Sequence, residues 1–437
     1  RFRNVTGVQT CALPILRQFS VDGHQFRFAA HHTGTDEELD AFVTDVQRIV
    51  TAERAVFGEF PGYEPGAYTF IADYLPYAGG DGMEHRNSTV VTSPGSIHGS
   101  RTGLLDTVAH EFFHNWNIER IRPRSLEPFN FERANMSDEL WLGEGFTQYY
   151  GALAMSRAGV ADLRSTAFDM GRLVTAVTAS PATAVRSAVD MSRMATFTDR
   201  GQPADRTNWR STFISYYSYG GALALALDLS LREHSGVRVT LDDFMRAMWR
   251  VHGTPPAPRP GLVATPYTVD DAERRLAEAS GDAGFARQFF DRHVRGRVLP
   301  DFDALLAQAG FVMQKQNPGR ASWGDFRVEA RKGVAIVEAP RSGTPAYKAG
   351  LDRDDEIRQV GDVRVTSPDE VASAIRAHRP GDSVEVAFVD RSGTVRTTTV
   401  VLEEDPSVRL VTLESAGRTP TAAQLAFRSA WLGQKGQ

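Results

Sequence analysis

The sequence predicts an α+β protein, in which a mostly helical part with a β-sheet lobe on its N-terminal side is followed by a smaller β domain. Three patterns support this prediction. Residues 17–28 alternate apolar and polar side chains across Asp22-Gly23, as a β-hairpin does. Apolar residues recur at helical spacing from 36 to 57 and in later segments up to about residue 312. From 323 to 402 short β patterns dominate.

Length and charge narrow the classes of function. The chain has 437 residues, enough for two or three domains with cores of their own. A net charge of −5 and an isoelectric point near 6.2 give no basic footprint, so we expect no nucleic-acid partner. The longest apolar stretch, 222–231, contains Asp228 and is too short to cross a bilayer. We therefore expect no transmembrane segment.

The first fifteen residues have an origin of their own. Residues 5–15 resemble the in-frame translation of a sequencing-library adapter, and the chain begins with Arg1. We interpret residues 1–15 as an artefact that packs on nothing. Cys11, the one cysteine of the chain, lies inside it, so the remainder predicts no disulfide and no thiol chemistry. The natural N-terminus would then be missing, which leaves a cytoplasmic or a periplasmic location open.

The segment from His110 to His114 gives the clearest indication of a metal-binding and catalytic site. Its sequence is His-Glu-Phe-Phe-His, and two histidines four residues apart leave the same face of a helix. Such a pair can hold one zinc ion, while Glu111 reaches a water on the same metal. Apolar neighbours at Leu104 and Val108 favour a buried helix over a charged surface helix.

A third ligand is expected in the next helix. Residues 137–150 form a helical pattern, with Ser137 as the expected N-cap and Glu144 as the one carboxylate among apolar and aromatic residues. A buried carboxylate is costly unless it is paired or bound to a metal. Pro123 and Pro128 make the connection a loop, so that two antiparallel helices could aim Glu144 at the histidines. The alternative is that Glu144 caps a helix or pairs with an arginine.

These residues resemble a known family. His110–Asn117 (His-Glu-Phe-Phe-His-Asn-Trp-Asn), Ile121-Arg122-Pro123 and Trp141–Phe146 are similar to motifs of the glycyl aminopeptidase family of zinc metallopeptidases, which are gluzincins. The resemblance implies a thermolysin-like catalytic domain at 36–316. It also implies that residues 16–35 are the remnant of an N-terminal β domain.

The same resemblance implies the content of the metal site. One Zn²⁺ per chain would be held by His110, His114 and Glu144, with Glu111 as the catalytic base.

A strand pattern before the histidines suggests how substrate binds. Residues 82–89, Gly-Met-Glu-His-Arg-Asn-Ser-Thr, resemble a strand of this family. The resemblance implies that Glu84 holds the substrate's free α-amine, with Met83 and His85 beside it as further substrate-binding residues. An ammonium needs such a desolvated anionic partner. The alternative is that Glu84 only pairs with Arg86.

The tyrosines at 216–219 resemble the family's Tyr-Tyr-x-Lys-Gly run, with Tyr219 in place of the lysine. The resemblance implies that Tyr217 donates a hydrogen bond to the tetrahedral oxyanion. The incomplete match leaves Tyr216 open in that role, and we count it with the substrate-binding residues. Tyrosines ahead of an apolar helix are otherwise common in cores.

The last third of the chain resembles a PDZ domain, which we expect at 322–405. Such domains add a peptide as an extra strand and hold its terminal carboxylate with backbone N–H groups. We assign that role to Gly333, Val334 and Ala335, which makes a C-terminal peptide a predicted partner. A closed domain that only packs on its neighbour is the alternative. The resemblance rests on 342–351, 354–357, a helix at 369–377, and strands at 383–389 and 395–401.

Residues 406–437 are expected to be a C-terminal tail that contains a helix at 421–432.

The combined hypothesis is a zinc aminopeptidase that acts on peptides with a free N-terminus, for which the family implies a small first residue, glycine or alanine. Three alternatives stay open. They are a zinc endopeptidase with PDZ-guided substrate binding, a zinc hydrolase of non-peptide substrates, and a catalytically impaired PDZ-type peptide-binding protein.

Overall fold

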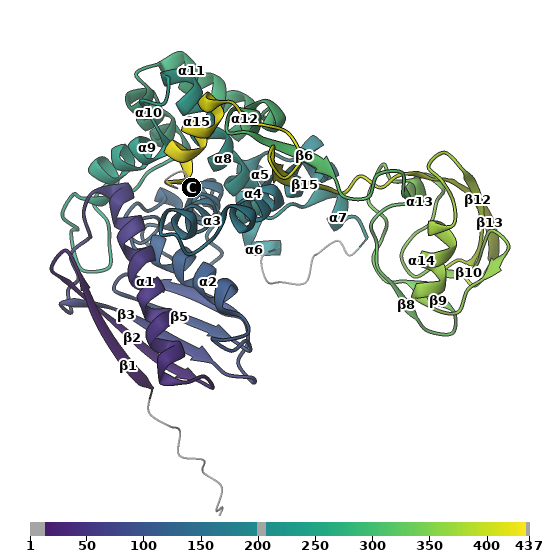
Figure 1. The fold of residues 1–437 in the computed structure, drawn as a ribbon, viewed down its shortest axis with the longest axis horizontal. Coiled ribbons are helices and arrows are strands. Elements are labelled where there is room, and N and C mark those ends of the chain that lie inside the picture. The colour runs from purple at the N-terminus through teal and green to yellow at the C-terminus, as the bar shows by residue number, and fades with distance from the viewer. Residues whose placement is uncertain (1–13, 199–206, 434–437) are drawn as a thin grey trace, which may run out of the picture.

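A computed structural model describes residues 14–198 and 207–433 (Figure 1). The molecule is α+β, as predicted. A helical body lies over a β-sheet made by the N-terminal part of the chain, and a smaller β-rich unit stands to one side of the body. Among the described residues no helix is both long enough and apolar enough to span a membrane.

The N-terminal sheet positions the Glu84 strand. Its hairpin turns at Asp22 and Gly23, whose φ values of 48° and 80° suit the tight turn that the sequence predicts. Strand β4 lies at one edge of the sheet, and among the described residues β5 is its only partner strand. In sheet order the strands are β1 (Ile15–Val21), β2 (His24–His32), β3 (Ala67–Tyr74), β5 (Ser88–Ser93) and β4 (Asp81–His85).

The hairpin β1–β2, predicted as the remnant of an N-terminal β domain, belongs to the same sheet as the strands that follow it. Strand β2 pairs in parallel with β3 along its length, and Phe26 and Phe28 are fully buried in the core of the helical body. Ile15, the last residue of the segment interpreted as an artefact, pairs with Ala30 in β1. Backbone pairing accepts any extended residue, and the side chain of Ile15 stays exposed. Residues 1–13 lie outside the described part of the chain.

Helix α1 (Asp36–Phe57) covers the sheet and has the limits that its pattern predicts. Thr35 and Glu38 form a capping box at its start, and Gly58, with φ 87°, ends it in the left-handed conformation. Its apolar stripe is buried. The limits of α1 are therefore set by its own capping residues and apolar pattern.

Helices α2 (Arg101–Phe113), α3 (Leu140–Arg157) and α8 (Tyr216–Ser235) form the centre of the body. Helices α3 and α8 pack closely because both carry glycine at the crossing. A Cβ on Gly145 would come within 2.3 Å of the Cα of Gly220.

Helix α3 begins at Leu140 rather than after Ser137. The hydroxyl of Ser137 donates to the Glu139 carboxylate, 3.0 Å away, and caps no helix through its side chain.

Shorter helices surround this centre. Single π-helical turns, Trp249–Gly253 and Phe290–Val294, extend two of them. The helices are α4 (Leu163–Thr178), α5 (Ala188–Arg193), α6 (Ala195–Thr198), α7 (Trp209–Thr212), α9 (Leu241–Met248), α10 (Val269–Ser280), α11 (Ala283–Phe289) and α12 (Phe302–Gln308).

The β-rich unit has a hydrophobic core of its own. Its sheet has the order β13-β12-β10-β9-β8, and β11 pairs with β10. The predicted helix and the two closing strands are present. The elements are β7 (Ala321–Ser322), β8 (Val328–Ala330), β9 (Val334–Ile336), α13 (Pro345–Lys348), β10 (Glu356–Val360), β11 (Val363–Arg364), α14 (Pro368–Arg376), β12 (Ser383–Val389), β13 (Val395–Val401) and β14 (Glu403–Glu404).

The predicted peptide-binding residues do not lie at a free sheet edge. Val334 and Ala335 belong to β9, which pairs with β8 on one side and β10 on the other. Both of its edges are therefore used, and no peptide can add to it. Gly333 comes directly before this interior strand, and β8 forms the sheet edge instead.

The C-terminal segment is part of the helical body rather than a free tail. Strand β6 (Phe311–Lys315) leads toward the β-rich unit and pairs with β15 (Val408–Thr412), which returns from it. Helix α15 (Ala422–Leu432) then packs on the body, where Trp431 is fully buried and donates from Nε1 to the hydroxyl of Tyr149, 2.8 Å away.

Candidate active site

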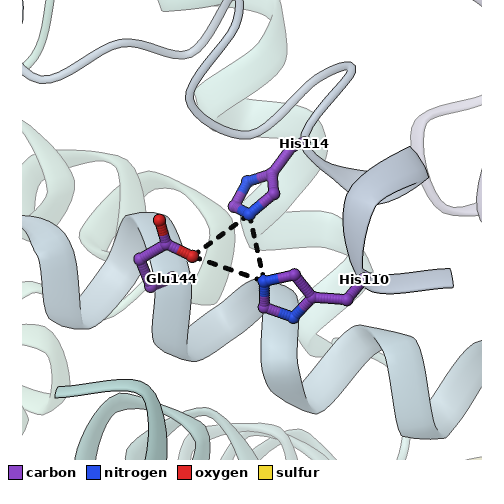
Figure 2. Close-up of side chains that lie close together, drawn as sticks. All are labelled: His110, His114 and Glu144. Atoms are coloured by element: carbon purple, nitrogen blue, oxygen red, sulfur yellow. Dashed lines mark hydrogen bonds and ion pairs between the residues drawn. The ribbon is translucent and has the colours of Figure 1, made fainter. Parts of the chain in front are cut away.

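Three side chains, from α2, from the residue that ends it and from α3, converge in the helical body. Figure 2 shows the imidazoles of His110 and His114 and the carboxylate of Glu144 pointing toward one another. The Nε2 atoms of the histidines are 3.1 Å apart, and Glu144 Oε2 lies 3.4 Å from His110 Nε2 and 3.1 Å from His114 Nε2. Ligands about 2.0–2.1 Å from a tetrahedral zinc lie ~3.3 Å from each other. The separations therefore fit one zinc-sized ion.

The helices place these side chains by running antiparallel. Asn117, just after α2, donates to the carbonyls of Leu142 and Gly143 at the start of α3. Further along, Gly151 of α3 lies against the backbone of His110, where a Cβ would be 3.4 Å from its nitrogen. This is the arrangement that the proline-containing loop suggests.

Asn117 also orients a histidine. Its carbonyl oxygen accepts a hydrogen bond from His114 Nδ1 at 2.9 Å, which leaves Nε2 with the lone pair. A second partner of this kind is typical of metal-binding histidines. Burial lowers the pKa of His110, which favours the neutral form that binds metals.

The site attracts positive charge. Burial opposes a charge on His114, yet the carboxylates of Glu144 and Glu84 raise its pKa well above the usual value. Burial likewise opposes ionisation of Glu144, but His114 and His110 hold its pKa well below the usual range. Two imidazoles and a carboxylate form a common catalytic zinc donor set. The residues present therefore fit zinc.

Glu111 approaches the site closely because its neighbour has no side chain. A Cβ on Gly82 would lie 2.1 Å from Glu111 Oε1, so the carboxylate occupies the space that any other residue would fill. Glu111 Oε2 is buried and has no hydrogen-bond partner among the described residues. Burial raises the pKa of Glu111 to about 8, although His114 opposes the rise. Such a carboxyl group can both accept and return a proton near neutral pH.

Glu84 faces the same place from the sheet edge. Its carboxylate, that of Glu111 and the His114 ring each offer an oxygen or nitrogen atom within 4.8 Å of the others. Arg120 fixes this strand to the end of α2, because Nη1 donates to the carbonyls of Arg86 and Asn115 at 2.9 and 2.8 Å. The Arg120 side chain is buried, so the link is shielded from water.

A cavity of about 300 Å³ joins these groups. Glu84, Glu111, Tyr217 and the three candidate ligands line it. The Tyr217 ring lies roughly parallel to that of His110, with 5.8 Å between centroids, at the first turn of α8.

Three predicted substrate-binding residues do not line this cavity. Tyr216 is packed in the hydrophobic core. Met83 and His85 flank Glu84 in β4, and alternate residues of a strand face opposite sides.

Four other residues of the wall were not predicted from the sequence, namely Gly82, Asp106, Thr107 and Gln148. Helical spacing could have found two of them, since Asp106 precedes His110 by four residues and Gln148 follows Glu144 by four.

Comparison with known proteins gives this region a family. Residues 103–223, from α2 to the start of α8, match the M61 glycyl aminopeptidase family. The chain is similar to that family over this segment. The match covers the two candidate histidines, Glu144 and Tyr217. Residues 311–402 match the PDZ domain family, so the β-rich unit is a PDZ domain.

A solved structure shares the fold. The aminopeptidase N family protein from Idiomarina loihiensis superposes with a TM-score of 0.79 at 21% identity, over 96% of this chain and 70% of that chain. At that identity the likeness shows the fold alone.

Two curated relatives match a short stretch. They are the serine proteases Do-like HtrA of Lactococcus lactis subspecies lactis and cremoris, 39% and 37% identical over 75 residues. The match covers 17% of this chain and 18% of each relative. The stretch is too short to carry over the activity of those proteins.

Proposed function

We propose that this protein is a zinc-dependent aminopeptidase, which hydrolyses the first peptide bond of substrates with a free N-terminus. One observation carries the proposal. A zinc-fitting donor set, an adjacent buried carboxyl group and a carboxylate on an open strand edge meet in a single cavity. We expect a small first residue, glycine or alanine, as the family resemblance implies.

His110, His114 and Glu144 would hold the metal, which supplies a Lewis acid and acidifies a water molecule. Glu111 takes the proton of the attacking water and passes it to the leaving amine. Its raised pKa, about 8, keeps the acid and base forms within reach of each other at neutral pH.

Tyr217 would support the reaction from beside His110. Its hydroxyl would donate a hydrogen bond to the oxyanion that forms at the scissile carbonyl. Its ring beside His110 keeps it within the same cavity.

Glu84 would decide which bond is cut. An α-ammonium group held by its carboxylate, next to Glu111, leaves room for one residue before the scissile bond. This restricts cleavage to the N-terminus. An endopeptidase would use the same zinc and base without this contact.

The test compares alanyl and glycyl fluorogenic amides with free and with acetylated N-termini, while zinc content is measured on the same preparation. Free substrates should turn over and acetylated ones should not, because acetylation removes the charge and adds bulk at Glu84. Equal cleavage of free and acetylated substrates would contradict the aminopeptidase hypothesis and favour the endopeptidase hypothesis. If zinc-loaded protein cleaves neither form and also cleaves none of a panel of longer peptides, the remaining hypothesis is a catalytically impaired peptide-binding protein.

A further inference from the structure

A buried arginine lies between the candidate metal site and the strand that carries Glu84. The side chain of Arg120, six residues after His114, is only 4% exposed. Burial lowers the pKa of Arg120 to about 10, so the guanidinium stays charged at neutral pH. A buried charge needs hydrogen-bond partners. Those of Arg120 are carbonyl and amide oxygens, and it forms no ion pair within the described ranges.

The hydrogen bonds of Arg120 join three separate segments. Nη1 donates to the carbonyl of Arg86, two residues after Glu84, at 2.9 Å. Nη1 also donates to the carbonyl and to Oδ1 of Asn115, just past α2, at 2.8 and 2.9 Å. Nη2 donates to the carbonyl of Gly62 at 2.9 Å. The guanidinium therefore connects the end of the metal-binding helix with the end of the Glu84 strand.

The amide of Asn115 extends this connection. Its Nδ2 atom donates to the hydroxyl of Tyr63 at 2.7 Å, and its side chain is fully buried. Tyr63 and Gly62 belong to the loop between α1 and β3. Arg120, Asn115, Gly62 and Tyr63 thus form one hydrogen-bonded unit, which we call the Arg120 bridge.

The backbone that leads to Arg120 is strained. Ile118 has a φ of 87°, which is unusual for a β-branched residue. Its side chain packs against Gly143 of α3, where a Cβ would come within 2.7 Å of Ile118 Cδ1. Such a conformation persists only where the surrounding contacts determine it, and it is common at functional sites.

The position of Glu84 depends on this connection, because little else fixes it. Strand β4 lies at the edge of its sheet. The Glu84 carboxylate itself has no hydrogen bond or ion pair in the part of the chain that the structure describes. It nevertheless lies within 4.8 Å of ligand atoms of Glu111 and His114.

We propose that Arg120 is a positioning residue, which fixes the distance between the Glu84 carboxylate and the zinc site. The inference rests on the proposed function, in which Glu84 holds the α-ammonium. Arg120 is not part of the cavity wall, so it acts through the backbone of β4 rather than on the substrate. Weakening the Arg120 bridge should therefore reduce recognition of the α-amine and leave zinc binding intact.

The test measures the binding of two hydroxamates to the zinc-loaded full chain by calorimetry at pH 7. Both compounds bind zinc, and propionohydroxamate differs from alanine hydroxamate only in lacking the α-amine. The ratio of their Kd values reports the contribution of the amine without any turnover. In the unaltered protein we expect alanine hydroxamate to bind about a hundredfold more tightly, as a desolvated charge pair provides. Glu84→Ala should bring the ratio close to one.

Arg120→Lys should lower this ratio on the order of tenfold, because an ammonium group cannot replace the planar fork and the strand is then less well placed. Tyr63→Phe removes one hydroxyl of the Arg120 bridge and should lower the ratio less. Zinc content and the Kd of propionohydroxamate should stay unchanged in both variants. The matched control is Arg428→Lys, which should keep the ratio. Arg428 is 6% exposed and donates to the carbonyls of Ala309 and Gly310 in another part of the body.

The outcomes separate this inference from the proposed function. An unchanged ratio in Arg120→Lys, or equal weakening of both hydroxamates, overturns the positioning role and leaves the aminopeptidase standing. If Arg120→Lys does not fold, an unchanged ratio in Tyr63→Phe overturns it. A ratio close to one in the unaltered protein overturns the Glu84 anchor and this inference with it. A lowered ratio in the variants of a chain that hydrolyses no peptide supports the positioning role and overturns the proposed function.

Discussion

Helix α3 carries two buried polar clusters only about one turn apart, and they differ in how well their groups are paired. At Glu144 the carboxylate faces two imidazoles, and the neighbouring Glu111 Oε2 has no hydrogen-bond partner among the described residues. At Tyr149 the hydroxyl donates to Asp228 Oδ2 at 2.6 Å and accepts from Trp431 Nε1 at 2.8 Å.

The second cluster is complete in itself. The other oxygen of Asp228 accepts from Arg232 Nε, one turn further along α8, at 2.9 Å and from the N–H of Leu241 at the start of α9 at 3.0 Å. The cluster thus ties α8 to α3, α9 and α15. Satisfied buried networks of this kind specify and stabilise a fold. The Glu144 cluster instead keeps ionisable groups for an external partner. We therefore assign stabilisation of the fold to the Tyr149 cluster and catalysis to the Glu144 cluster.

The largest effect is expected at Glu111. Glu111→Gln should retain zinc and the fold but lose three or more orders of magnitude in turnover, about 4 kcal/mol in the barrier, because the water keeps its place and loses its proton acceptor. Steady-state assays with metal analysis check this. Near-normal turnover would remove Glu111 from the mechanism.

The matched change in the other cluster is Asp228→Ala. It leaves the Arg232 guanidinium, which is 2% exposed, without its carboxylate. We expect a loss of about 3–5 kcal/mol in the free energy of unfolding, measured by urea denaturation, while zinc content per folded chain stays unchanged. A stable variant that loses zinc would reverse the division between the clusters.

Glu84→Ala should affect substrates rather than folding. A loss on the order of 2–5 kcal/mol in transition-state binding is expected for free-amine substrates, because the α-ammonium is left half-paired. Zinc content should not change. Equal kcat/KM values for the variant and the unaltered protein would contradict the anchor role.

The smallest effect is expected for Asp106→Asn. This variant tests how the free energy of unfolding depends on pH. Burial raises the pKa of Asp106 in the folded protein to about 6, above its usual 3.8, so ionisation costs stability as pH rises between these values and the full cost is present above about 6. Asp106→Asn removes this cost. The variant should be more stable by about 1–3 kcal/mol at pH 8, and the gain should shrink toward pH 4. Denaturant midpoints at both pH values measure it, and equal gains at both would show another cause.

The sequence predicted the features that depend on residues close together in the chain. Helix α1 has both caps in its sequence, and the two candidate histidine ligands in and directly after α2 follow from four-residue spacing. The prediction that Glu144 points toward the histidines followed from its position as the one carboxylate among apolar and aromatic residues.

Long-range pairing was not predicted. Nothing in the sequence of β2 shows that it pairs with β3, or in that of β9 that both its edges are occupied. A cavity of about 600 Å³ beside the candidate active site was missed for the same reason, because its wall combines residues of α2, α3, α4, α7, α8 and the PDZ domain. Such a site exists only once the elements are packed.

Zinc content tests the central claim most directly. Elemental analysis of the purified full chain should give about one zinc per chain. His114→Ala should abolish it, while Tyr149→Phe, a change of similar burial in the neighbouring cluster, should leave it unchanged. Catalytically active protein without zinc, or equal zinc in His114→Ala and the unaltered chain, would contradict the account.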